Sequence, residues 1–127
     1  MGRSIRRLGM TCVAFFAACM LACADPVGTY SMTGSNPETG SPYKGQVSVI
    51  QTGDTYRVVW NVGQQQIIGV GMLYKNFFSV AYRLGNAAGI AFYTEEGNDW
   101  AGVWALIGGS KLGTERWTRS PKRQVDP

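Results

Sequence analysis

The chain has 127 residues, and its 12 lysines and arginines against 8 aspartates and glutamates give a formal charge of +4. It contains no histidine, and its three cysteines, Cys12, Cys19 and Cys23, all precede residue 25. The chain after residue 24 therefore lacks the residues of a Ser-His-Asp or Cys-His catalytic arrangement and of an ordinary zinc site. From this composition we expect no enzyme, no metal site and no cofactor.

The first 24 residues have the organisation of a bacterial secretory signal peptide. A positive start with Arg3, Arg6 and Arg7 precedes the apolar run Leu8–Ala22, and Ala22 and Ala24 provide the small residues of a cleavage site. We therefore expect removal of residues 1–24 and export of the protein, to the periplasm or as a secreted protein. A lipid anchor at Cys23 in the outer membrane is the alternative, and it is the one membrane attachment that we expect.

Removal of this segment changes the charge that the protein presents to its partners. Three of the twelve basic residues lie within residues 1–24, so the remaining chain is close to neutral. It keeps no basic stripe that could neutralise phosphates, and we therefore expect no nucleic-acid partner.

From residue 25 onward the chain reads as a series of short β-strands. Segments rich in Val, Ile, Tyr, Phe, Trp and Thr are separated by turn signals about every eleven residues, a spacing typical of an all-β meander. Turns are expected at Gly53-Asp54, Gly63-Gln64, Lys75-Asn76, Gly85-Asn86, Gly97-Asn98 and Gly108-Gly109. Strands are expected at Gly28–Met32, Tyr43–Gln51, Thr55–Asn61, Gln66–Leu73, Phe77–Arg83, Gly89–Thr94, Trp100–Ile107 and Gly113–Arg119.

Short connections favour strands that pair in sequence order, and eight such strands can close on themselves. We therefore expect one all-β domain over residues 25–119, folded as a single eight-stranded up-and-down barrel, with a two-sheet β-sandwich as the alternative. The one long connection, Thr33–Pro42, is a surface loop that serves either as a simple crossover or as a lid over the barrel mouth. Residues 120–127 are expected to form a flexible tail.

Alternation along the strands separates an inner from an outer set of side chains. The expected interior consists of Tyr56, Val58, Trp60, Trp100, Trp104 and Trp117, with Gly69, Gly71 and Gly102 leaving room for the rings. Two neighbouring strands are apolar on both faces. Their surplus, Ile68, Val70, Met72, Phe78 and Val80, is expected to form an exposed patch that meets a second subunit, a protein target or lipid.

The acidic residues offer little catalytic chemistry. Glu115 is expected to form a structural ion pair with Arg116 or Arg119 at the end of the barrel, although a buried acid–base pair is the alternative. Glu95, Glu96 and Asp99 surround one turn, and we interpret them as a solvated hairpin tip because their spacing matches no EF-hand loop.

Several stretches resemble a group of short exported bacterial all-β proteins of unknown function, some of which are labelled "fibronectin-binding protein". The stretches are TGDTYRVVW, GVG in the fourth expected strand, SVAYRLGNAAGIAFY, DWAGVW and GTERWTR. The resemblance extends from Gly28 to Arg119 and implies an exported β-domain, but it assigns no binding residue.

The sequence therefore predicts a non-enzymatic binding module that holds a protein partner or a small apolar ligand by a barrel face or mouth, with oligomerisation as a further prediction. The residues expected to contribute are Tyr56, Trp60, Trp100, Trp104, Trp117, Ile68, Val70, Met72, Phe78 and Val80. The main alternative is an inhibitor of a secreted hydrolase such as a protease, which would insert Asp25–Gly28 into the active-site cleft. A hydrolase or isomerase that uses Glu115 or Asp99 is a third hypothesis, but no nucleophile–base pair accompanies either carboxylate.

Overall fold

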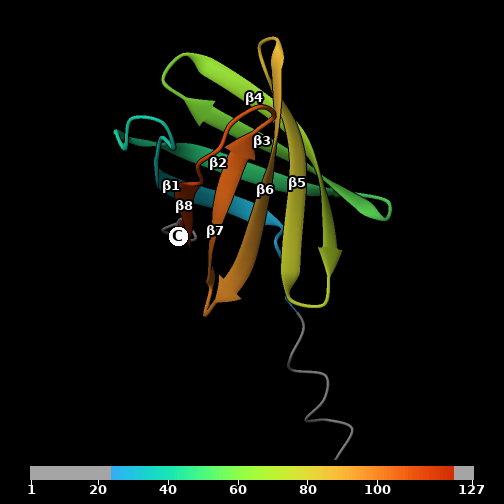
Figure 1. Cartoon of the computed structure of the whole chain (residues 1–127). Helices are drawn as coiled ribbons and strands as arrows, with labels where there is room; N and C mark the ends of the chain where they lie inside the picture. The colour runs from blue at the N-terminus through green and yellow to red at the C-terminus, as the bar shows by residue number, and fades with distance from the viewer. Residues whose placement is uncertain (1–23, 122–127) are drawn as a thin grey trace, which may run out of the picture.

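The computed structural model describes residues 24–121, which form a closed antiparallel β-barrel (Figure 1). Its strands are β1 (Gly28–Ser35), β2 (Pro42–Thr52), β3 (Thr55–Val62), β4 (Gln65–Tyr74), β5 (Phe77–Leu84), β6 (Ala87–Glu96), β7 (Asp99–Leu106) and β8 (Gly113–Arg119). Each strand pairs with its neighbour in sequence, and β8 pairs with β1 to close the barrel. The expected up-and-down barrel is confirmed, and the β-sandwich alternative is wrong.

Two predicted segments lie largely outside the described residues. Of the predicted signal peptide only Ala24 is described, and of the predicted tail only Ser120 and Pro121. Within residues 24–121 the structure contains no helix, and so none that is long and apolar enough to cross a membrane.

Tight turns join most strands, because glycine supplies the backbone conformation that these turns need. Gly53, Gly63, Gly85 and Gly97 have φ between 61° and 65° and begin two-residue loops, the position at which hairpin turns need a positive φ. Lys75 occupies the same position between β4 and β5 with φ 57°, in a region that residues with a Cβ avoid.

The connection between β1 and β2 is shorter than expected. β1 continues to Ser35, which pairs with Pro42 at the start of β2, so the loop contains only residues 36–41. Asn36 organises it: its side-chain Oδ1 accepts the backbone N–H of Glu38 at 2.9 Å, and its carbonyl accepts the N–H of Gly40 at 2.8 Å.

One half of the barrel interior is packed solid with aromatic side chains. The fully buried rings include Tyr30, Phe78, Trp100 and Trp117, and Phe78 lies 5.9 Å from Trp100 and 6.2 Å from Trp117 between ring centroids. A Cβ at Gly71 would lie 2.5 Å from the Phe78 ring, so this glycine is needed for the ring to fit.

The N-terminal segment closes this filled end. Pro26 is fully buried, and its carbonyl accepts the Tyr30 hydroxyl at 2.7 Å. Arg119 donates to the carbonyls of Val27 at 2.8 Å and Asp25 at 2.9 Å, and its guanidinium lies 4.8 Å from the centroid of the Tyr30 ring. The segment that the alternative inhibitor hypothesis would insert into a hydrolase is therefore packed against its own barrel.

The expected exposed patch is wrong for two of its five members. Phe78 and Val80 face the interior and are 0% and 1% exposed, because β5 presents its even-numbered side chains to the core. Ile68, Val70 and Met72 are 44%, 50% and 63% exposed on the outer face of β4. The exposed hydrophobic residues near them on the outer face are Tyr74, Phe77, Ile90 and Phe92.

Candidate functional site

The other half of the barrel is hollow. A cavity of about 220 Å³ is lined by Asn36, Tyr43, Trp60, Val62, Gln65, Ile67, Tyr82, Leu84, Ala91, Tyr93, Trp104 and Glu115. Its rim is formed where β1 ends, where β3 turns into β4, and where β5 ends. The exposed side chains of Asn36 and Gln65 stand at this rim, and the deeper wall contains apolar and aromatic side chains.

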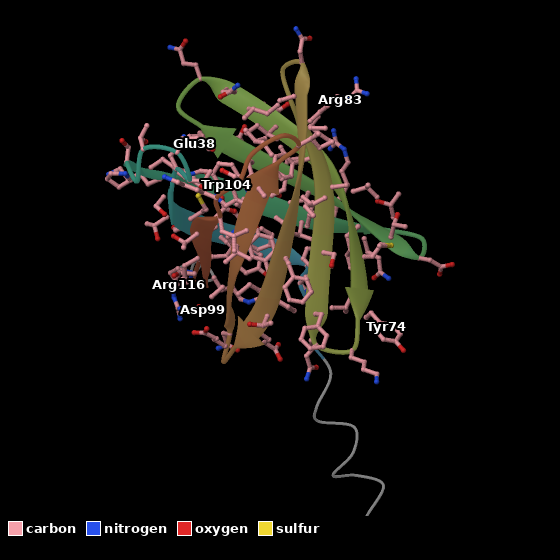
Figure 2. All side chains as sticks on the ribbon, viewed as in Figure 1. Glu38, Tyr74, Arg83, Asp99, Trp104 and Arg116 are labelled. Carbon is pink, nitrogen blue, oxygen red and sulfur yellow. The ribbon has the colours of Figure 1, made fainter. Side chains whose placement is uncertain are left out.

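The labelled side chains show which end of the barrel holds the cavity. Figure 2 shows Trp104 and Glu38 toward the end with the cavity, and Asp99, Arg116 and Tyr74 toward the filled end. Glu38 belongs to the β1–β2 loop, and its carboxylate approaches Gly109 of the β7–β8 loop, so the two loops lie side by side at the mouth.

Glu115 is the only charged side chain in the buried interior of residues 24–121, with 7% of its surface exposed. Its Oε1 accepts hydrogen bonds from Trp60 Nε1 at 2.8 Å, Trp117 Nε1 at 2.8 Å and the Tyr93 hydroxyl at 2.7 Å. Its Oε2 accepts the Tyr43 hydroxyl at 2.6 Å. Four donors from four different strands thus converge on one carboxylate at the floor of the cavity.

This network fits an ionised carboxylate. An indole N–H can only donate, so the Oε1 atom that receives two indoles and a phenol must act as an acceptor. The O–H···O distances of 2.6 and 2.7 Å are those of hydrogen bonds to a charged oxygen. The four donors compensate the desolvation of the charge, which would otherwise disfavour its burial.

The carboxylate and the apolar surroundings act on the neighbouring phenols. Burial raises the pKa of Tyr93 well above 10, and the negative charge of Glu115 raises it further. The same two causes, in the same order, raise the pKa of Tyr43 and Tyr82. All three phenols therefore stay protonated at neutral pH, so that Tyr43 and Tyr93 can donate their protons to Glu115.

Aromatic rings form much of the cavity wall. Trp60 and Tyr82 lie 5.4 Å apart between centroids, and Tyr43 meets Trp104 edge to face at 6.2 Å. Small residues leave space for two of these rings, since a Cβ at Gly89 or Gly113 would lie 2.6 Å from the rings of Tyr82 and Trp104 respectively.

The structure divides the predicted aromatic residues between the two halves of the barrel. Trp60 and Trp104 line the cavity, whereas Tyr56 and Trp100 belong to the filled half. Trp117 lies beneath Glu115 and joins the halves, packing 4.3 Å from Tyr93 between ring centroids. All five rings face inward as expected, but only two of them contact the cavity.

The expected pairing of Glu115 with Arg116 or Arg119 is wrong. Arg116 lies on the outer face of β8, where it forms ion pairs with Glu96 at 2.9 Å and Asp99 at 3.2 Å. Because β8 alternates its faces, Glu115 and Arg116 point in opposite directions. Asp99 therefore cannot assist Glu115 in acid–base chemistry, and within residues 24–121 no cluster of three or more acidic side chains could hold a metal ion.

The sequence did not single out Tyr43, Tyr82 and Tyr93. Alternation alone could not have assigned Tyr82 and Tyr93, because β5 and β6 both carry apolar side chains on their two faces. Tyr43 is the second residue of β2, in a segment rich in polar residues, and only the closure of the barrel brings it to Glu115.

Two solved structures are similar to this barrel. The REP1-NXSQ fatty acid transporter matches it with a TM-score of 0.54 at 9% sequence identity, covering 80% of this chain and 100% of that chain. A mutant of the fluorescent protein UnaG matches with a TM-score of 0.52 at 10% identity, covering 76% of this chain and 97% of that chain. At these identities the similarity shows the fold alone. No protein-family model matches the chain, and no curated protein does so.

Proposed function

We propose that this protein is a non-enzymatic binding protein that holds a small, largely apolar ligand in the cavity above Glu115. The observation that carries the proposal is the division of the interior into a filled half and an open half of about 220 Å³. If the interior served only as a hydrophobic core, side chains could fill both halves. The apolar and aromatic wall with a few convergent polar groups is the usual composition of a small-molecule site.

The cavity volume limits the size of the ligand. An engineered cavity of about 150 Å³ binds benzene, so this cavity suits a molecule of roughly ten non-hydrogen atoms. The similarity to a protein named as a fatty acid transporter supports a binding barrel, although a long chain would have to extend past Asn36 and Gln65 at the rim.

Two Ala→Leu substitutions, one inside the cavity and one outside it, test the proposal. Ala91 is 3% exposed and lines the cavity, whereas Ala81 is exposed on the outer face of β5. With 2-phenylethanol as a probe in isothermal titration calorimetry, we expect binding to the unchanged protein and to Ala81→Leu, and at least about tenfold weaker binding to Ala91→Leu. Equal affinity for both variants, or no binding of 2-phenylethanol, 2-phenylethylamine and phenylacetate to the unchanged protein, would overturn the proposal.

The outer face of the β4–β6 region supports a second candidate function, which is binding of a protein partner or self-association. Val70, Ala81 and Ile90 are neighbours in register across β4, β5 and β6, and Met72, Ser79 and Phe92 form the next row. Sedimentation of the purified protein would test self-association; a Met72→Glu substitution should shift any dimer toward monomer. A monomer at all concentrations would remove self-association and leave only a different protein as the partner.

The inhibitor hypothesis loses its motivating feature, because Arg119, Tyr30 and the buried Pro26 hold the N-terminal segment in place. Export, with the periplasm or the extracellular space as destination and the lipid anchor at Cys23 as the alternative, stays a prediction. Mass spectrometry of the protein from its native host would distinguish cleavage after Ala24 from lipidation at Cys23.

A further inference from the structure

We infer that the ligand of the cavity is a small organic cation, a protonated amine on an apolar body of roughly ten non-hydrogen atoms. This inference rests on the proposed function and names the ligand class of the same site. It follows from the charge of the cavity, the identity of its wall and the hydrogen-bonding capacity that Glu115 retains.

The cavity has a net negative charge. Its donors to Glu115 are two indoles and two phenols, which compensate the carboxylate through dipoles but add no positive charge. None of the described residues that line the cavity is a lysine or an arginine. A negative charge in a cavity with low-dielectric walls attracts cations and repels anions more strongly than the same charge in water.

Arg119 does not neutralise this charge. It shares the inward face of β8 with Glu115 but lies four residues further along, roughly 13 Å away at the usual rise of a strand. Its guanidinium is committed to the carbonyls of Val27 and Asp25 and to the Tyr30 ring at the filled end. Arg116 points outward and pairs with Glu96 and Asp99.

The aromatic rings in the cavity wall also attract cations. Tyr43, Trp60, Tyr82 and Trp104 all line the cavity, and the faces of aromatic rings carry partial negative charge. Aromatic rings arranged around a site are a recurrent way to bind organic ammonium groups. The apolar body of such a ligand would contact Val62, Ile67 and Leu84 in the same cavity.

Glu115 also retains capacity for one more donor. Its Oε1 already accepts three hydrogen bonds, whereas its Oε2 accepts only that of Tyr43. Each carboxylate oxygen offers about two acceptor positions, so Oε1 accepts more than its usual number and Oε2 has one position that Tyr43 does not use. An ammonium N–H can therefore reach Oε2 without displacing Tyr43, and a ligand carboxylate would meet repulsion at the same place.

Three ligands of nearly equal size test the inference on the unchanged protein. They are 2-phenylethylamine, 2-phenylethanol and phenylacetate, which are cationic, neutral and anionic at pH 7. By isothermal titration calorimetry we expect the amine to bind about tenfold or more tightly than the alcohol, and phenylacetate to bind most weakly. If the alcohol binds and the amine is no tighter, or if phenylacetate equals the amine, the inference is wrong while the proposed function stands. If none of the three binds, the proposed function itself fails.

Two variants with the same change in net charge then locate the effect. Glu115→Gln removes the carboxylate in the cavity, and Glu96→Gln removes an exposed carboxylate on the outer face. We expect Glu115→Gln to lose the preference for the amine over the alcohol and Glu96→Gln to keep it. A preference retained in a folded Glu115→Gln variant would contradict the inference. Should that variant fail to fold, the ligand series on the unchanged protein decides alone.

Discussion

Trp60 on β3 donates its indole N–H to the Glu115 carboxylate on β8 at 2.8 Å, across the interior of the barrel. The two residues are 55 positions apart in the chain, and neither strand is hydrogen-bonded to the other in the sheet. Their contact, with those of Tyr43 and Tyr93, ties opposite walls of the barrel together at the floor of the cavity. The same group that stabilises the fold thus gives the cavity its charge.

Removing one donor from this network should destabilise the protein measurably. Tyr93→Phe keeps the ring and removes the 2.7 Å hydrogen bond to the carboxylate, which should lower the free energy of unfolding by about 1.5–3 kcal/mol. Urea denaturation measures the change. Tyr74→Phe is the matched control, because Tyr74 is 72% exposed and its substitution should change stability by less than about 0.5 kcal/mol. Equal effects of the two substitutions would show that the network contributes no stability.

The buried phenols should make the protein sensitive to alkali. Burial raises the pKa of Tyr30, Tyr43, Tyr82 and Tyr93 above 10 in the folded state, so the unfolded chain releases these protons first as the pH rises. The stability linked to them is present in full below pH 10. Above that pH it falls by about 1.4 kcal/mol per pH unit for each phenol, until the folded-state pKa is reached.

Urea denaturation between pH 8 and pH 11, followed by phenolate absorbance, tests this linkage. The free energy of unfolding of the Tyr93→Phe variant should fall less steeply with pH, by about 1.4 kcal/mol per pH unit, because this variant lacks one of the buried phenols. Ionisation of all the phenols in a protein that remains folded and equally stable would contradict the assignment of Tyr30 and Tyr93 as buried groups.

Lys75 is a site where a substitution should increase stability. Its φ of 57° is strained for a residue with a Cβ, and the corresponding positions of neighbouring hairpins hold glycine. Lys75→Gly should raise the free energy of unfolding by about 0.5–1 kcal/mol, since relief of strain exceeds the added entropy of the unfolded chain. Gly97→Lys places the same strain in the β6–β7 turn and should have the opposite effect; if both changes are neutral, φ at these turns has no energetic consequence.

The fold could be predicted from local signals because most of its determinants are local. Turn glycines at regular spacing and two-residue alternation depend on neighbours in sequence, so the eight strands, their order and the inward direction of Tyr56, Trp60, Trp100, Trp104 and Trp117 followed from the sequence. The two apolar faces of β5 made alternation ambiguous there, which is why Phe78 and Val80 were assigned to the surface.

The candidate site depends on non-local geometry. The sequence predicts an ion pair for Glu115 because Arg116 and Arg119 are the charged residues nearest to it in the chain. Arg116, however, lies on the opposite face of the strand. The partners that it has in the structure come from β2, β3 and β6 and from Trp117 on its own strand. Only the closure of the barrel and the packing of its filled half determine that the cavity lies above this carboxylate.

The most direct test of the central claim uses the four tryptophan indoles as reporters in a two-dimensional ¹⁵N–¹H NMR titration with 2-phenylethylamine. Trp60 and Trp104 line the cavity, whereas Trp100 is fully buried in the filled half and does not line it. We expect saturable shifts of the Trp60 and Trp104 indole signals, with the Trp100 signal unchanged. Absence of saturable shifts at Trp60 and Trp104, or shifts of equal size at Trp100, would contradict binding in the cavity above Glu115.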